Sequence, residues 1–336
     1  MTSDAGEYRG AVPPVEDGAA RPLWSVVIPS FNCARYLRET LQSVLAQDPG
    51  PEAMQIEVID DHSSDDPASV VAELGRGRVS FFRQPRNLGL TGNFHVGLTR
   101  ARGHLIHLLH GDDQILPGFY AKLEAAFLTR PDIGAAFCRH VFIDGDGKQL
   151  GISDLEQTQN GVLQNGLERL ALEQRIVTPS IVVKREAYEK LGAFDSRLIC
   201  AEDWEMWVRI AAHYPIWYEV EPLAAYRMHE NSNTGRHTSR AEELRYTRMA
   251  IDLFTPYLPA DRATEVTRRA RETYALTAVR RAGTLRDAGD RKAAKAHLRE
   301  ALKLSRSPRV LRGLLGFAAR GVWRDRGPLK KDADAH

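Results

Sequence analysis

Residues 104–113 read HLIHLLHGDD, and this stretch decides how the first half of the chain is interpreted. Its apolar run predicts a buried β-strand over residues 104–109. The strand leads directly into Gly111, Asp112 and Asp113, a turn-forming glycine followed by two carboxylates. Two acids at the end of a buried strand indicate a metal or phosphate site. Asp113 could equally cap the helix that follows, since aspartate is a favoured N-cap.

The same strand pattern recurs upstream of this stretch. Residues 24–28 (WSVVI), 56–59 (IEVI) and 79–82 (VSFF) are short apolar runs rich in β-branched or aromatic side chains. Helical spacing of apolar residues follows at residues 37–45, and a second helix is expected over residues 91–100. Strands that alternate with helices predict an α/β fold with a mostly parallel central sheet and right-handed crossovers.

Polar, turn-forming residues follow three of these strands. The three clusters are Ser30-Phe31-Asn32, Asp60-Asp61-His62-Ser63 and Gly111-Asp112-Asp113. In sheets of this kind, ligands bind beyond the carboxyl ends of the strands. The clusters are therefore expected to meet at one site.

The pattern of apolar and polar residues divides the rest of the chain into four segments. Residues 1–22 lack an apolar segment of the signal-peptide kind, and their composition predicts a disordered leader. The α/β domain is expected over residues 23–237, with strands flanking the turn at 144–147, helices near 164–174 and 202–213, and a strand at 223–226. A helical region is expected over residues 238–325, with a turn at 288–290, and a disordered tail over residues 326–336.

Composition narrows the class of protein. Apolar residues make up 43% of the 336, which is enough for a core, and no apolar run approaches the roughly 18 residues of a membrane-spanning helix. The three cysteines are far apart and form no metal or disulfide pattern, so a reducing cytoplasm is the expected compartment.

Five sequence blocks resemble glycosyltransferase family 2, the inverting enzymes with the GT-A fold. The blocks are SVVIPSFNCARYL from Ser25, EVIDDHSSDD from Glu57, RNLGLTGNF from Arg86, LLHGDDQILP from Leu108 and AEDWEMWVRIA from Ala201. The resemblance covers residues 22–235. It implies transfer of a sugar from a UDP-, dTDP- or GDP-sugar to the hydroxyl of a glycan, a lipid-linked glycan or a natural product, as in surface-polysaccharide biosynthesis.

The resemblance also implies a metal site. Asp112 and Asp113 match the family's acidic motif, in which one acid holds Mn²⁺ or Mg²⁺ and the other contacts the ribose of the donor. His110 stands where the fullest form of the motif has a further acid. By the same resemblance His229 meets the metal or the diphosphate.

The nucleotide and the acceptor have implied contacts of their own. Asp61 would read the nucleotide base, with an Asx-turn as the alternative role. The remaining donor-side residues are Pro29, Phe31, Asn32, Arg86 and Asn93. Asp203 would be the general base that deprotonates the acceptor hydroxyl, with Glu202 as its support. Trp204 would wall the acceptor site or pack its helix.

The C-terminal region is strongly basic, with 20 Lys and Arg against 9 Asp and Glu from Asp261 onward. Helical spacing puts five of the basic residues on one face: Lys292, Lys295, Arg299, Lys303 and Arg306. This face could contact the anionic inner surface of the cell membrane, or could be a solvated face of a packed helix. No nucleic-acid module accompanies the charge, so nucleic acid is not an expected partner.

The sequence argues against two other functions. A sugar-phosphate nucleotidyltransferase should carry a Gly-rich basic loop after the first strand, and residues 30–33 (SFNC) are not such a loop. A non-catalytic nucleotide-sugar-binding protein should have lost acidic positions, yet Asp61, Asp112, Asp113 and Asp203 are all present.

Overall fold

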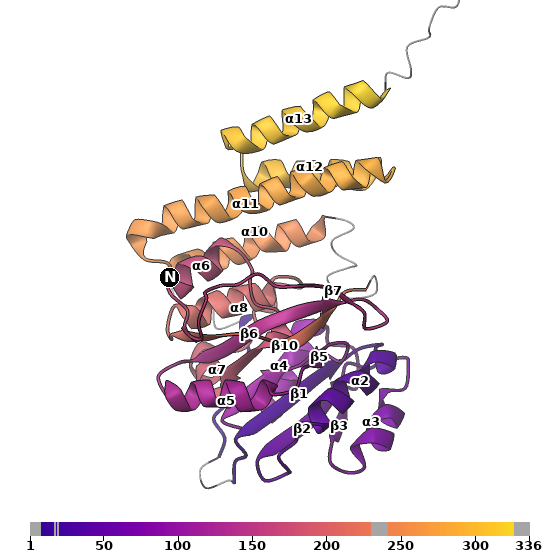
Figure 1. The fold of residues 1–336 in the computed structure, drawn as a ribbon, viewed down its shortest axis with the longest axis vertical. Coiled ribbons are helices and arrows are strands. Elements are labelled where there is room, and N and C mark those ends of the chain that lie inside the picture. Colours follow the sequence, from indigo (N-terminus) through magenta and orange to yellow (C-terminus); the bar gives the residue numbers. More distant parts are fainter. Residues whose placement is uncertain (1–7, 17, 19, 230–240, 326–336) are drawn as a thin grey trace, which may run out of the picture.

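The computed structural model describes residues 8–16, 18, 20–229 and 241–325. They form a ten-stranded sheet with helices on both faces, and long helices stack at one end of this body (Figure 1). The expected boundary between residues 237 and 238 and the expected tail over residues 326–336 lie outside the described residues.

The first half of the sheet is parallel, as expected. Its strands run in the order β3-β2-β1-β4, and each pairs in parallel with its neighbour. The strands are β1 (Trp24–Ser30), β2 (Met54–Asp60), β3 (Ser80–Arg83) and β4 (Leu105–Leu108), and the helices between them are α2 (Ala34–Leu45), α3 (Pro67–Gly75) and α4 (Leu90–Arg100). The α/β fold class is thereby confirmed.

The second half of the sheet is mixed. Strand β9 (Ile181–Lys184) runs antiparallel to both β4 and β6, whereas β6 and β10 pair in parallel. The other elements are β5 (Gln114–Ile115), α5 (Phe119–Thr129), β6 (Ala135–Ile143), β7 (Gln149–Ile152), β8 (Gly161–Val162), α6 (Gly166–Leu172), the 3₁₀ turn η1 (Thr178–Ser180), α7 (Arg185–Leu191), α8 (Glu202–Ala211) and β10 (Ile216–Arg227).

Strand β1 is buried along its whole length, which explains its continuous apolar sequence. Val26 belongs to the core under α2, α3 and α5, and Val27 belongs to the core under α4, α7 and α8. Burial on both faces fixes the register of the strand. The polar residues that follow β1 are thereby held at one edge of the sheet.

The C-terminal region is helical, with the expected turn between α11 and α12. It comprises α10 (Glu242–Phe254), the 3₁₀ turn η2 (Thr255–Tyr257), α11 (Ala260–Asp287), α12 (Arg291–Leu304) and α13 (Pro308–Asp325). Helix α10 packs on α8 and helix α11 on α6, while α12 and α13 lie farther from the sheet (Figure 1). Among the described helices, none combines the length and low polarity needed to cross a bilayer.

Of the five basic residues predicted for one helical face, Lys292, Lys295, Arg299 and Lys303 lie on α12 and are exposed. Arg306 is exposed as well, but it follows the helix, which ends at Leu304. The opposite face is buried through Ala294, His297 and Ala301, and it packs against α10 and α11. The predicted amphipathic helix is therefore present. Its partners are other C-terminal helices rather than the sheet.

The N-terminal segment differs from the disordered leader that its composition predicts. Within the described residues 8–16, Arg9 pairs with the buried carboxylates of Asp195 and Glu205, and Val12 is buried. The carbonyl of Pro13 accepts a hydrogen bond from Arg185. Composition could not reveal this because the segment contributes few apolar contacts and is anchored by hydrogen bonds and ion pairs to distant residues.

Candidate active site

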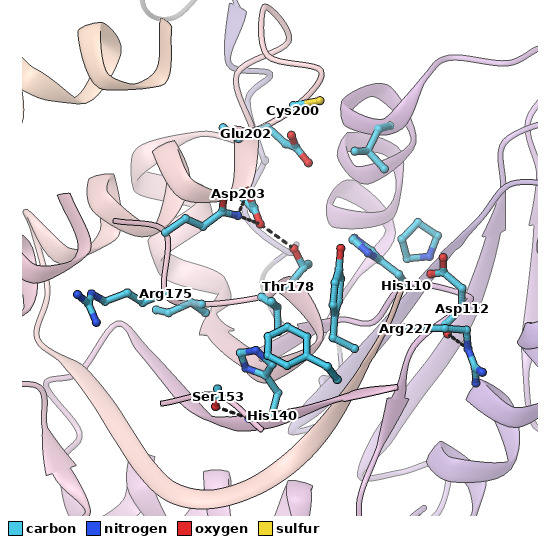
Figure 2. Close-up of a pocket in the computed structure, with 18 of the residues that line it drawn as sticks. His110, Asp112, His140, Ser153, Arg175, Thr178, Cys200, Glu202, Asp203 and Arg227 are labelled. Carbon is cyan, nitrogen blue, oxygen red and sulfur yellow. Dashed lines mark hydrogen bonds between the residues drawn. The ribbon is translucent and has the colours of Figure 1, made fainter. Parts of the chain in front are cut away.

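A cavity of about 780 Å³ opens at the carboxyl ends of β1, β2 and β4 and extends to the start of α8 and to helices α10 and α11. Most of the predicted site residues line it: Pro29, Phe31, Asn32, Asp61, Asn93, Asp112, Glu202, Asp203 and His229. Figure 2 shows Asp112 and Asp203 on opposite sides of the view. The predicted donor and acceptor halves therefore share one cavity.

The loop after β1 forms one wall of the cavity. Phe31 is 42% exposed, which is unusual for a phenylalanine and leaves its ring free to stack on a ligand. Asn32 has a left-handed backbone, and its side-chain oxygen accepts from the backbone N–H of Ser64 at 2.7 Å. Asn32 thus ties the loop after β1 to the loop after β2.

Asp61 closes β2 and is 3% exposed. Its two carboxylate oxygens accept from the backbone N–H groups of Leu88 and Gly89, at 2.7 and 3.0 Å. Burial raises the pKa of Asp61 in spite of these hydrogen bonds. The adjacent Asp60 points elsewhere: it accepts from Ser63 and pairs with Arg83. Asp60 therefore stabilises the loop after β2 through its contacts with Ser63 and Arg83.

Arg86 and Asn93, which belong to one sequence block, lie in different surroundings in the structure. Asn93 is buried on α4, donates to the carbonyl of Ile59 at 2.8 Å and lines the cavity. Arg86 is exposed and is absent from the cavity lining. The predicted contact of Arg86 with the diphosphate therefore stays a prediction.

The Gly111 turn is packed closely against the loop after β1. A Cβ atom on Gly111 would lie 2.9 Å from the sulfur of Cys33 and 3.2 Å from the carbonyl oxygen of Pro29. Ligand atoms of His110, Asp112 and Asp113 lie within 4.8 Å of one another. Asp112 lines the cavity, whereas Asp113 is 1% exposed and its Oδ1 accepts from the backbone N–H of Arg227 at 2.8 Å.

This cluster has the chemistry of a divalent-cation site. Asp113 Oδ2 and His110 Nε2 are buried, and neither has a hydrogen-bond partner among the described residues. Burial and the charge of Asp112 raise the pKa of Asp113 well above its usual value, and the hydrogen bond and charge of Arg227 offset only part of this rise. Carboxylate oxygens with imidazole nitrogen suit Mn²⁺, and carboxylates suit Mg²⁺. The residues therefore fit the predicted ion.

His229 follows β10 and meets the acidic turn. Its Nε2 lies 2.9 Å from Asp112 Oδ2. Burial by itself raises the pKa of Asp112, but the hydrogen bond from His229 and the charges of His110 and His229 outweigh it and lower that pKa. The structure thus brings His229 to the predicted metal site.

Arg227, the last residue of β10, has a structural role beside the acidic turn. Its guanidinium donates to the carbonyls of Asp112 and Asp144 and pairs with Glu39 at 2.6 Å. The side chain is fully buried. Arg227 therefore holds the turn that contains Asp112 against the end of β10.

Asp203 lies in the first turn of α8 and lines the cavity. Gln174 Nε2 donates to both of its carboxylate oxygens, at 2.9 and 2.8 Å, and Thr178 approaches Oδ2 at 3.5 Å. Burial raises the pKa of Asp203 to about 6, although these hydrogen bonds lower it. A carboxylate with a pKa near neutrality is suited to act as a general base.

The two neighbours of Asp203 differ in role. Glu202 lines the cavity and is 5% exposed, and its Oε2 has no hydrogen-bond partner within the described part of the chain. Trp204 is 1% exposed, donates to the carbonyl of Leu170 and packs on Phe254. The prediction that Trp204 might wall the acceptor site is therefore wrong in this structure, because the indole is used to hold α8 in the core.

The cavity lining also contains residues for which the sequence predicts no role. They include His140, Phe142, Gln174, Arg175, Tyr226, Thr247 and Tyr274. Thr178 of η1 lines the cavity as well. No local pattern marks the others, because they come from β6, β10, α10, α11 and a loop, and only the fold brings them together.

Comparison with known proteins agrees with this geometry. The family model described as Glycosyl transferase family 2 matches residues 25–192. An uncharacterised protein of Mycobacterium tuberculosis is 31% identical over 229 residues, which are 65% of this chain and 70% of that protein. An uncharacterised glycosyltransferase of Methanocaldococcus jannaschii is 29% identical over 217 residues, or 63% of this chain and 73% of that protein.

Solved structures share the fold. Residues 1–349 of TarS from S. aureus, in complex with UDP-GlcNAc, superpose with a TM-score of 0.58 at 14% identity, covering 83% of this chain and 91% of that chain. Of a longer TarS chain, 43% is covered. The mannosyltransferase PcManGT from Pyrobaculum calidifontis, in complex with GDP-Man and Mn²⁺, gives a TM-score of 0.58 at 19% identity, with 94% of this chain and 84% of that chain covered.

Proposed function

The chain belongs to glycosyl transferase family 2, and on this premise we propose that it moves a sugar from a nucleoside-diphosphate donor to an acceptor hydroxyl, with inversion at the anomeric carbon. One observation carries the proposal. The acidic turn at Asp112 and the carboxylate of Asp203 line the same cavity. A donor whose diphosphate lies at the turn can present its sugar toward Asp203.

In the proposed reaction Asp203 accepts the proton of the acceptor hydroxyl. The hydroxyl oxygen then forms a bond to the anomeric carbon, and the bond from that carbon to the diphosphate breaks. The electron pair of that bond leaves with the nucleoside diphosphate. A single carboxylate suffices for one displacement, and one displacement inverts the configuration.

The leaving diphosphate needs its charge neutralised. We propose that Asp112 and Asp113 hold Mn²⁺ or Mg²⁺, with His229 as a further ligand or a diphosphate contact. When bound, the ion acts as a Lewis acid on the diphosphate. The buried carboxylate oxygen of Asp113 that lacks a partner among the described residues supports this assignment.

The donor and acceptor are proposed by class. The exposed ring of Phe31 and the buried Asp61 suit a nucleotide base, and the relatives' ligands named above include UDP-GlcNAc and GDP-Man. A UDP-, dTDP- or GDP-sugar is therefore the proposed donor. Aromatic side chains of the cavity lining, among them Phe142 and Tyr226, suit the faces of sugar rings, so the proposed acceptor is a glycan, free or lipid-linked.

The proposal is tested with nucleotides and a single substitution. A thermal-shift screen of UDP, dTDP and GDP, with and without Mn²⁺, should give the largest stabilisation with one base and with the ion present, by mass action. Asp203→Asn should keep this shift, yet lower the rate of sugar transfer by about 100-fold or more, because only the base is lost.

The matched control is Asp132→Asn, an exposed aspartate paired with Arg130 outside the cavity lining, and it should leave transfer unchanged. Release of no nucleoside diphosphate from any donor, with either ion, would overturn the proposed function. Full transfer activity of Asp203→Asn would overturn the assignment of the base.

A further inference from the structure

Gln174 makes the closest side-chain contacts of Asp203. It lies in the loop between α6 and η1, and its side-chain amide reaches both carboxylate oxygens, at 2.9 and 2.8 Å. The backbone N–H of Trp204 donates to Oδ1 at 2.7 Å. These donors restrict how the carboxylate can rotate, which decides where its free lone pairs point.

Gln174 is in turn held from the C-terminal helices. Its backbone N–H donates to the hydroxyl of Tyr274 on α11, at 3.0 Å. The ring of Tyr274 lies 5.0 Å from that of Trp204, the residue next to Asp203. Tyr274 also lines the cavity, together with Glu243 and Thr247 of α10. Tyr274 of α11, a hundred residues beyond Gln174 in the sequence, therefore contacts both Gln174 and Trp204, and each of these residues donates a hydrogen bond to Asp203.

We infer that Gln174 and Tyr274 are positioning residues for the general base, so that the C-terminal helical region completes the active site of the transferase domain. The inference rests on the proposed role of Asp203. Gln174 orients the carboxylate and stabilises its ionised form through two donated hydrogen bonds. Tyr274 fixes the backbone from which Gln174 reaches. In this scheme neither residue takes up or releases a proton.

The environment of Gln174 argues against a purely structural role. The residue is exposed, so the folded core does not depend on its side chain. The hydrogen bond from Gln174 lowers the pKa of Asp203, against the larger effect of burial, which raises it. Loss of the amide should therefore raise that pKa further, and a residue that only packs would have no such effect.

The test is the pH dependence of sugar transfer. Gln174→Met keeps the length of the side chain and removes its donors. The rising limb of the kcat profile should move to higher pH by roughly one unit, since a hydrogen bond to a charged group is worth about as much as one unit of pKa. The KM for the donor should not change. Gln164→Met, at another exposed glutamine outside the cavity lining, is the control.

Tyr274 is tested by Tyr274→Phe, which keeps the ring on Trp204 and removes the hydroxyl. We expect a smaller shift in the same direction, and no additional shift when Gln174→Met is already present. Tyr246→Phe on α10, outside the cavity lining, is the control.

An unchanged pH profile of kcat in Gln174→Met, together with an inactive Asp203→Asn, would overturn this inference alone. An active Asp203→Asn would instead overturn the proposed function.

Discussion

At the scale of single residues, the two carboxyl groups that open α8 differ sharply in their surroundings. Asp203 receives hydrogen bonds from Gln174 and from the backbone, and burial raises its pKa to about 6. Burial raises the pKa of Glu202 further, to about 8, with the charge of Asp203 as the second cause. At neutral pH Asp203 can act as a base while Glu202 holds its proton.

The raised pKa of Glu202 predicts a loss of stability at high pH. Between its usual pKa of 4.5 and about 8 the folded state binds more protons than the unfolded state, so stability falls as pH rises through this range. Glu202→Gln cannot ionise. It should match the wild type at pH 4 and be more stable at pH 8, since each pKa unit is worth about 1.4 kcal/mol.

Urea unfolding of both proteins at the two pH values measures this difference. Glu52→Gln, at an exposed loop position, should show no growth of the difference with pH. If Glu202→Gln gains nothing between pH 4 and pH 8, then Glu202 ionises normally and the description of its surroundings is wrong.

At the scale of elements, α4 approaches β1 so closely that only glycine fits between them. A Cβ atom on Gly97 would lie 2.4 Å from Cγ1 of Val27, a buried residue of the strand. Helical periodicity predicted this helix well, but it could not show which face meets the sheet so closely. This contact holds Asn93, one turn earlier on α4, at the edge of the cavity.

Gly97→Ala should therefore destabilise the protein by about 1–3 kcal/mol, the usual cost of overpacking a core. Gly283→Ala on α11 is the matched control: no atom lies within 4 Å of its added Cβ, and alanine in a helix should stabilise by roughly 0.5–1 kcal/mol. Denaturant midpoints at constant m-value report both changes. Equal effects of the two substitutions would contradict the close packing of α4 on β1.

At the scale of the whole molecule, the C-terminal helices carry two distinct surfaces. One side packs on α6 and α8 and reaches the cavity through Tyr274. Farther out, the basic face of α12 is exposed, and the leucines Leu302, Leu311 and Leu315 of α12 and α13 are exposed as well. Basic residues beside exposed leucines support the proposal of a peripheral contact with anionic lipid at the inner face of the cell membrane.

Charge reversal tests this contact. Lys295→Glu, Arg299→Glu and Lys303→Glu together should weaken sedimentation with phosphatidylglycerol–phosphatidylcholine vesicles by about 100-fold or more, at about 1 kcal/mol for each basic residue. The same number of reversals at Arg76, Arg102 and Lys148, exposed positions of the sheet domain, is the control. Binding that is unchanged by the α12 reversals, or insensitive to salt, would show that this face is only solvated.

The parallel half of the sheet and the acidic turns at its edge are predictable from local sequence patterns. Buried parallel strands need continuous apolar runs, and the residues after them must turn, so both are visible locally. Asp61 and Asp112 could be found in this way, whereas Asp203 could be found only through the family resemblance. All three line one cavity.

The side chains that surround those acids depend instead on contacts between distant parts of the folded chain. Gln174 and Tyr274 lie beside Asp203, Trp204 is core, and Arg86 lies outside the cavity lining. The antiparallel β9 and the anchored residues 8–16 likewise depend on distant partners. Such contacts form between residues far apart in the chain, after the ends of long loops have been brought together, and nothing in the neighbouring sequence specifies them.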